Sequence, residues 1–190
     1  MNSVKTINRA GLLEMVARLY VFFFLNVYGW GKMAGMQFYR RGKLPEEVAL
    51  TTLGEASAYD LGWTFMGYST AYIIFIGSAQ IVGAWLLLWP RTKLLGVAVL
   101  LPILFNIIAF DLVFLDKKGA LIAALLYTFL LLYVVWFNRR LVGEALRALT
   151  ASAEPGFFRG QRWWLHAAAV VLVAGLLFAL DQTLVGIAGR

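Results

Sequence analysis

Residues 63–114 carry the two apolar runs that decide the fold. They read WTFMGYSTAYIIFIGSAQIVGAWLLLWP over 63–90, RTK over 91–93 and LLGVAVLLPILFNIIAFDLVF over 94–114. The runs at 63–89 and 94–110 each have roughly the 17–25 residues that an α-helix needs to cross a hydrocarbon core. Loops and lone strands are excluded there, because lipid offers the backbone no hydrogen-bonding partner. Pro90 cannot continue a helix, so the stretch predicts a transmembrane helical hairpin.

The composition of the whole chain indicates a membrane protein. Of its 190 residues, 62% are hydrophobic and 14% are charged, and the mean hydropathy is +0.77. These values lie outside the soluble range. The formal net charge of +7 comes without a basic and aromatic module, so nucleic acid is not an expected partner. The absence of cysteine excludes disulfides, thiol redox chemistry and cysteine-ligated metals.

Three further apolar runs predict membrane helices at about residues 11–33, 120–137 and 163–185. Glu14 and Arg18 interrupt the first run, which is therefore not typical of a cleaved signal peptide. Their i,i+4 spacing predicts an ion pair on one helix face. The predicted fold class is an all-α polytopic membrane protein, with an antiparallel four-helix transmembrane bundle plus a fifth C-terminal transmembrane helix.

The segments between the membrane helices suggest three parts. Residues 34–60 form a long loop, in which proline and two acids at 45–47 predict a short surface helix at 45–50. After residue 138, a stripe of apolar residues lies opposite charged ones at helical spacing, which predicts a basic amphipathic helix on an anionic membrane surface. The stripe is Val142, Ala145, Leu146 and Leu149, opposite Arg140, Glu144 and Arg147. We predict a bundle at 1–138, an interfacial connector at 139–162 and a fifth transmembrane helix at 163–190.

The distribution of basic residues predicts the orientation in the membrane. With five spans, 10 of the 17 lysine and arginine residues fall on the side of the N-terminus and 7 on the other side. Cytoplasmic segments carry the excess of these residues. The N-terminus is therefore expected in the cytoplasm and the C-terminus outside.

Antiparallel threading brings polar side chains from four helices to the same membrane face. Polar groups in lipid usually turn inward and mark a pocket or pathway. The predicted ligand-binding residues are Asn26, Tyr28, Lys32, Tyr68, Tyr72, Asn106, Asp111 and Tyr127. Asp111 carries most weight, because a lone carboxylate about one turn inside the membrane is costly unless it is paired or protonated.

Lys32 is the expected partner of Asp111, at matching depth on the first helix. Two interpretations stay open. In the first, the two charges bound a polar pocket beneath the 34–60 loop. In the second, they form a structural ion pair at the interface, with the tyrosines as an aromatic belt. Gln80 is expected to hydrogen-bond across helices near the midplane, in a structural role.

Other kinds of site find little support in the sequence. His166 is the only histidine, which excludes bis-histidine haem within one chain and makes a metal site improbable. Gly29-x-Gly31-Lys32 interrupts a membrane helix and is no phosphate loop. No serine has a histidine or an acid arranged for nucleophilic catalysis.

A diffuse pattern over about residues 10–140 resembles the DoxX family of small bacterial membrane proteins. It consists of WTFMGYS at 63–69, Tyr72, FIG at 75–77, Gln80, Gly83, LLL at 86–88 and RTKLLG at 91–96, with YGxGKxxGxQF at 28–38. The resemblance implies a place in the inner membrane and a link to membrane redox assemblies, including quinone-linked thiosulfate oxidation. The pattern contains no catalytic signature.

Two hypotheses about function follow. In the first, the chain is a membrane subunit that binds a quinone or a similar lipophilic small molecule between helices one to four and serves a redox partner. In the second, it is a non-catalytic scaffold that docks a partner protein, or another copy of itself, through residues 34–60 or 139–150. No covalently bound cofactor is expected, so any redox chemistry must come from the ligand or the partner. Whether the chain is itself an enzyme stays open.

Overall fold

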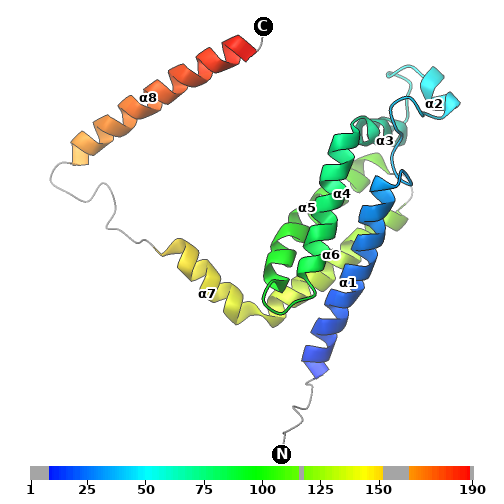
Figure 1. The fold of residues 1–190 in the computed structure, drawn as a ribbon, viewed down its shortest axis with the longest axis horizontal. Coiled ribbons are helices and arrows are strands. Elements are labelled where there is room, and N and C mark those ends of the chain that lie inside the picture. The colour runs from blue at the N-terminus through cyan, green and yellow to red at the C-terminus, as the bar shows by residue number, and fades with distance from the viewer. Residues whose placement is uncertain (1–8, 116–117, 152–162, 189–190) are drawn as a thin grey trace, which may run out of the picture. The chain divides into compact units, whose positions relative to one another are not determined.

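The computed structural model describes residues 9–115, 118–151 and 163–188 (Figure 1). Its regular structure is helical, and the β-pairing described is an isolated bridge between Arg40 and Lys43. The helices are α1 (Arg9–Met33), α2 (Glu46–Leu50), α3 (Ala58–Gly67), α4 (Thr70–Leu86), α5 (Lys93–Phe114), α6 (Gly119–Phe137), α7 (Arg139–Thr150) and α8 (Trp163–Ala188). The chain divides into two compact units, residues 1–143 and 144–190, and each is described by itself.

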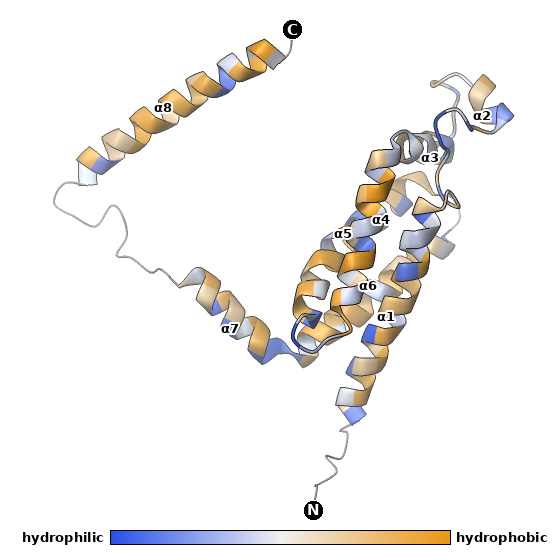
Figure 2. Cartoon of the chain, in the orientation of Figure 1, coloured by the Kyte–Doolittle hydropathy of each residue, from blue (hydrophilic) through white to orange (hydrophobic). Residues whose placement is uncertain are grey.

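Four helices of the described chain are long and apolar enough to cross a membrane. These are α1, α5, α6 and α8, and the bent pair α3–α4 would make a fifth span. Figure 2 shows apolar residues along nearly the whole length of these helices. The predicted bounds of the first, third, fourth and fifth membrane helices agree with the structure to within about four residues. The chain is thus an all-helical protein with the helices of a membrane protein.

In the first unit, α1, α4, α5 and α6 pack around one core. Each contacts two of the others, α1 meeting α4 and α6 while α5 meets the same two. Successive helices run in opposite directions (Figure 1). The centre holds fully buried aliphatic residues, among them Val21, Leu25, Leu100, Leu104 and Leu131. The outer faces carry exposed apolar side chains, as surfaces in contact with lipid do.

The predicted second helix, residues 63–89, is wrong as one straight segment. The structure has two helices there, and α3 and α4 are bent by 89° relative to each other. Ser69 between them is extended (φ −114°, ψ 119°), and its hydroxyl caps α4 by accepting a hydrogen bond from the Tyr72 N–H. The carbonyl of Tyr39 packs against Gly67, where a Cβ would overlap it. Hydropathy misses this break because the residues there, from Gly67 to Thr70, are uncharged and apolar runs flank them on both sides.

The predicted ion pair between Glu14 and Arg18 is confirmed, at 3.0 Å. The structure adds partners from elements distant in sequence. Lys93 Nζ lies 2.8 Å from Glu14 Oε1, and Asn138 Nδ2 donates to the same oxygen at 3.3 Å. Arg18 also donates to the carbonyl of Leu87 at 2.8 Å. This buried cluster joins α1 to the α4–α5 turn, α5 and the end of α6.

The amphipathic helix predicted after residue 138 is present as α7, separated from α6 at Asn138. Its stripe residues Leu146 and Leu149 are exposed, and its place on a membrane surface stays a prediction. Within the second unit, the described side chains of helix α8 are exposed except that of Ala167, which is half-buried. Residues 116–117, and the part of the predicted connector from 152 to 162, lie outside the described residues.

Candidate functional site

A cavity of about 370 Å³ lies between α1, α4, α5 and α6, in the half of the packed helices nearest α3. Most of its wall is apolar. Leu25, Phe75, Ile103 and Phe110 contribute side chains from three helices. The polar side chains in the wall come from all four helices and from the loop after α1: Tyr28, Lys32, Gln37, Tyr72, Gln80, Asn106, Asp111 and Tyr127. A mostly apolar cavity with a few polar groups is the usual form of a small-molecule site.

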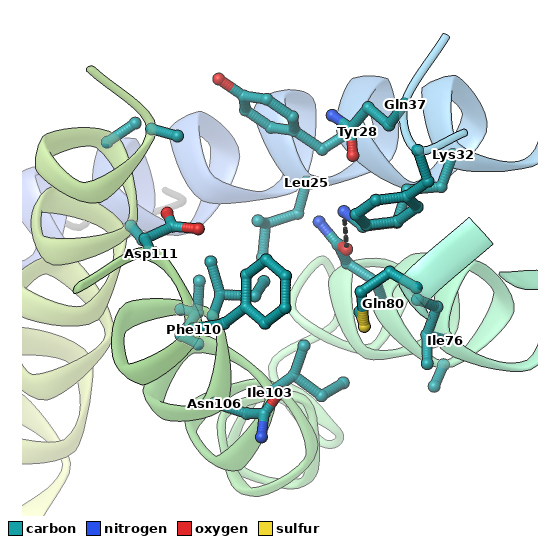
Figure 3. Close-up of a pocket in the computed structure, with 18 of the residues that line it drawn as sticks. Leu25, Tyr28, Lys32, Gln37, Ile76, Gln80, Ile103, Asn106, Phe110 and Asp111 are labelled. Atoms are coloured by element: carbon teal, nitrogen blue, oxygen red, sulfur yellow. Dashed lines mark hydrogen bonds between the residues drawn. The ribbon is translucent and has the colours of Figure 1, made fainter. Parts of the chain in front are cut away.

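Asp111 is the least satisfied polar group of this cavity. Only 5% of its surface is exposed, and its carboxylate points from α5 into the cavity (Figure 3). The Oδ2 atom has no hydrogen-bond partner among the described residues. Buried polar atoms are nearly always hydrogen-bonded. A buried polar atom without a hydrogen-bond partner destabilises the fold by about 1–3 kcal/mol, or by more if the group is charged. The orphaned oxygen is therefore available to a ligand.

Lys32 lies across the cavity from Asp111 and is 7% exposed. Its ammonium donates to Gln80 Oε1 at 3.0 Å (Figure 3) and lies 5.9 Å from the centre of the Tyr28 ring. The prediction that Lys32 and Asp111 both face the interior is confirmed. Their predicted ion pair is wrong, because the two charged groups lie more than 4.0 Å apart. The cavity separates them, and Gln80 takes the place of the carboxylate.

An aromatic cluster forms the wall between α1 and α6. The ring of Tyr127 is buried and stacks on Phe24, with centroids 5.9 Å apart. The rings of Tyr28 and Tyr20 lie 6.3 and 6.2 Å from it. Such a cluster is rigid, because aromatic side chains have few rotatable bonds and pack over large areas. It offers flat faces and hydroxyl groups on one side of the cavity.

The loop after α1 closes the end of the cavity. Phe38 and Trp63 both line it, with ring centroids 5.2 Å apart. Phe38 has φ +68°, a left-handed conformation that costs a bulky residue roughly 1–2 kcal/mol. Its neighbour Tyr39 donates its N–H to the Trp63 carbonyl at 3.2 Å and its hydroxyl to Asp60 Oδ1 at 3.2 Å. Partial burial, followed by this bond to Asp60, raises the pKa of the Tyr39 hydroxyl.

Comparisons with known proteins place the chain in a family. No family model matches it, and no solved structure matches it. It is 33% identical over 123 residues to a protein of Bacillus subtilis (strain 168) named "Uncharacterized protein YwoB", an alignment that spans 65% of this chain and 75% of that protein. The chain belongs to the YwoB family. That name carries no ligand or activity, so any function for this member must be argued from its cavity.

In this YwoB-family chain, six of the eight predicted ligand-binding residues line the cavity, namely Tyr28, Lys32, Tyr72, Asn106, Asp111 and Tyr127. Asn26 does not. It lies one position from Leu25, about 100° around α1, and its Oδ1 accepts a hydrogen bond from Trp85 Nε1 at 3.0 Å. Tyr68 lies at the break between α3 and α4, where it is exposed and packs against the Arg41 guanidinium at 5.3 Å.

Sequence reasoning missed the contributions of the loop and of α3 to the cavity, chiefly Gln37, Phe38 and Trp63. The prediction used the depth of each residue along a membrane helix, and this measure does not apply to residues in a loop. The fold of the loop also depends on residues distant in sequence, such as Trp63 and Asp60. Gln80 was expected to bond across helices, and it does so, but on the cavity wall. Among the described residues, no group of three His, Cys, Asp or Glu side chains could hold a metal ion.

Proposed function

We propose that this chain is a DoxX-like subunit of the bacterial inner membrane that binds a quinone or a similar lipophilic small molecule and serves a redox partner. In this proposal, α1, α3–α4, α5 and α6 form an antiparallel transmembrane bundle, and α8 is a fifth span. The observation that carries the proposal is the buried carboxylate of Asp111, whose Oδ2 is unpaired within the described chain and faces an apolar cavity.

The chemistry of the walls suits a flat ring with oxygen atoms at opposite ends. Lys32 Nζ can donate to an oxygen of the ring on one side, while the Asp111 carboxylate can accept from a hydroxyl on the other, which a quinone carries in its reduced, quinol form. The aromatic cluster around Tyr127 supplies faces for the ring between them. The volume of about 370 Å³ lies in the range of small-molecule sites, about 300–1,000 Å³. The chain supplies binding and orientation, and the electrons belong to the ligand and its partner.

Asp111→Asn is expected to lower the amount of quinone that co-purifies with the protein by about tenfold, because the charge-assisted hydrogen bond from the hydroxyl of its reduced, quinol form is lost. The thermal midpoint should stay equal or rise, since the variant no longer buries an uncompensated carboxylate. Mass spectrometry of solvent extracts and thermal unfolding of the purified protein measure the two effects. Asp181→Asn, on an exposed part of α8, is the matched control and should change neither. Loss of stability in proportion to loss of quinone would instead make Asp111 a structural residue.

The scaffold hypothesis keeps one observation in its favour. Leu50 and Leu53, in the connection between α1 and α3, are 79% and 82% exposed. Leucines exposed only three positions apart offer an apolar surface that a partner protein can cover. If the scaffold role holds, Leu50→Ser with Leu53→Ser should abolish function in cells while Asp111→Asn leaves it intact. The ligand-binding role predicts the opposite pattern.

The proposed orientation can be tested directly, because the chain has no cysteine to interfere. Cysteines introduced at Arg41 and at Arg147 are expected to react with a membrane-impermeant maleimide from opposite sides of the membrane. In intact spheroplasts only Arg41→Cys should be labelled, and Arg147→Cys should react after the membrane is opened. Labelling of both from the same side would overturn the arrangement of spans.

A further inference from the structure

The four seams between neighbouring helices are not equally closed around the cavity. At the α1–α4 seam, Gly29 and Gly77 let the backbones meet, since a Cβ on Gly29 would lie 3.1 Å from the Gly77 carbonyl oxygen. At the α1–α6 seam, the stacked rings of Phe24 and Tyr127 fill the space. At the α5–α6 seam, Leu104 and Ala124 are both buried. Among the described cavity-lining residues of α1 and α6, Ala120 alone is exposed, so these three seams are largely closed.

The α4–α5 seam is closed at one end only. Near the α4–α5 turn, a Cβ on Gly83 would lie 2.8 Å from the Leu100 side chain, and one on Gly96 would lie 2.8 Å from the Gly83 carbonyl oxygen. Toward α3, cavity-lining residues of both helices are open to the outside. Tyr72 and Phe75 on α4 are 42% and 69% exposed, and Asn106 on α5 is exposed.

We call this opening the α4–α5 gap and define it by Phe75, Ile76, Ile103 and Asn106. All four line the cavity. Figure 3 shows Ile103 and Asn106 on the side of the cavity away from α1, with Ile76 on the neighbouring helix. If α4 and α5 cross the membrane, the gap opens sideways into the hydrocarbon layer. A ligand could then bind its polar part in the cavity while another part remains in lipid.

We propose that the ligand is a membrane-dissolved amphiphile whose polar ring lies between Lys32 and Asp111 and whose apolar tail leaves the cavity through the α4–α5 gap. The inference rests on the proposed function and adds the class of ligand, a ring with a long tail. Lys32 and Asp111 are buried, whereas three of the four residues that define the gap are apolar, so the polar part of such a molecule belongs in the cavity and its apolar part in the gap.

We expect the α4–α5 gap to discriminate between ligands by the shape of their tails. A tail that moves from lipid to a gap lined mainly by apolar side chains gains little free energy, because lipid chains are as apolar as those side chains. A tail-less ring and a tailed ring should therefore bind the wild-type protein with similar affinity once partitioning into lipid is corrected for. Filling the gap should exclude only the tailed molecule, since specificity can arise from a clash as well as from an added contact.

The test compares two probes in lipid nanodiscs: menadione, a naphthoquinone without a tail, and the same ring with a twenty-carbon isoprenoid tail. Ile103→Trp fills the gap from α5, and Ala79→Leu narrows it from α4 in case the larger change unfolds the protein. Either variant should weaken binding of the tailed probe by about tenfold or more (about 1.4 kcal/mol) and leave menadione binding within about threefold. Phe105→Trp is the control, because Phe105 is exposed on α5 and does not line the cavity.

The outcomes separate this inference from the proposed function. Equal weakening of both probes, or no weakening of the tailed one in folded variants, would overturn the tail path while wild-type binding still supported the quinone site. If the wild-type protein binds neither probe and its extracts hold no quinone, both proposals fall. Discrimination between the probes in Ile103→Trp or Ala79→Leu, with Phe105→Trp unchanged, would establish the tail path.

Discussion

Glu14→Ala is expected to lower the free energy of unfolding by about 3–5 kcal/mol, the cost of breaking a buried ion pair by removing one partner. Glu14 is 3% exposed. Its two carboxylate oxygens hold Arg18 at 3.0 Å, Lys93 at 2.8 Å and the Asn138 amide at 3.3 Å. The variant leaves the cations of Arg18 and Lys93 close together without an anion between them. It also removes the interactions that connect α1 to α5 and to the end of α6.

Unfolding of purified protein in a mild detergent, followed by circular dichroism, measures this effect. Glu144→Ala is the control, since Glu144 is exposed on α7, and its change should stay within about 0.5 kcal/mol. Glu14→Gln should lie between the two, because the amide keeps an acceptor oxygen but loses the charge. If Glu14→Ala unfolds like Glu144→Ala, the charge cluster does not stabilise the fold.

Gly96→Val is expected to destabilise the protein by about 3 kcal/mol, the upper part of the usual range for overpacking. A Cβ at this position would lie 2.8 Å from the Gly83 carbonyl oxygen and 2.9 Å from the Leu87 nitrogen. Both are backbone atoms and cannot turn aside as a side chain can, so α4 and α5 would have to separate. Association of helices in lipid depends on such close backbone approach at small residues.

Gly31→Val on α1 is the matched control, because no atom outside its own helix backbone lies within 4 Å of the Cβ position there. The same substitution in a helix should be neutral or slightly stabilising at that site, as valine restricts the unfolded chain more than glycine does. The two thermal midpoints can be measured side by side. Equal midpoints would show that the contact between Gly83 and Gly96 does not hold the two helices together.

The helices and most of their bounds could be predicted from the sequence. A backbone in lipid must satisfy its own hydrogen bonds, so each long apolar run has to be a helix. The same reasoning applies to local features: the short α2 follows Pro45, α7 follows its apolar stripe, and Glu14 pairs with Arg18 one turn away. Six of the eight residues chosen by their depth in the membrane line one cavity. Depth is informative because helices that alternate in direction place residues of equal depth at the same level.

The tertiary structure decided what depends on helix rotation and on the loops. Lys32 bonds to Gln80, 48 residues away, rather than to Asp111, and Asn26 turns toward Trp85 and away from the cavity. Depth alone cannot distinguish these cases, since residues at one level differ by about 100° for each step along a helix. The break before α4 required the Tyr39 carbonyl to pack on Gly67. In lipid, apolar surfaces are satisfied on every side, so hydropathy cannot say which face of a helix turns inward, and only the packing of the helices settles it.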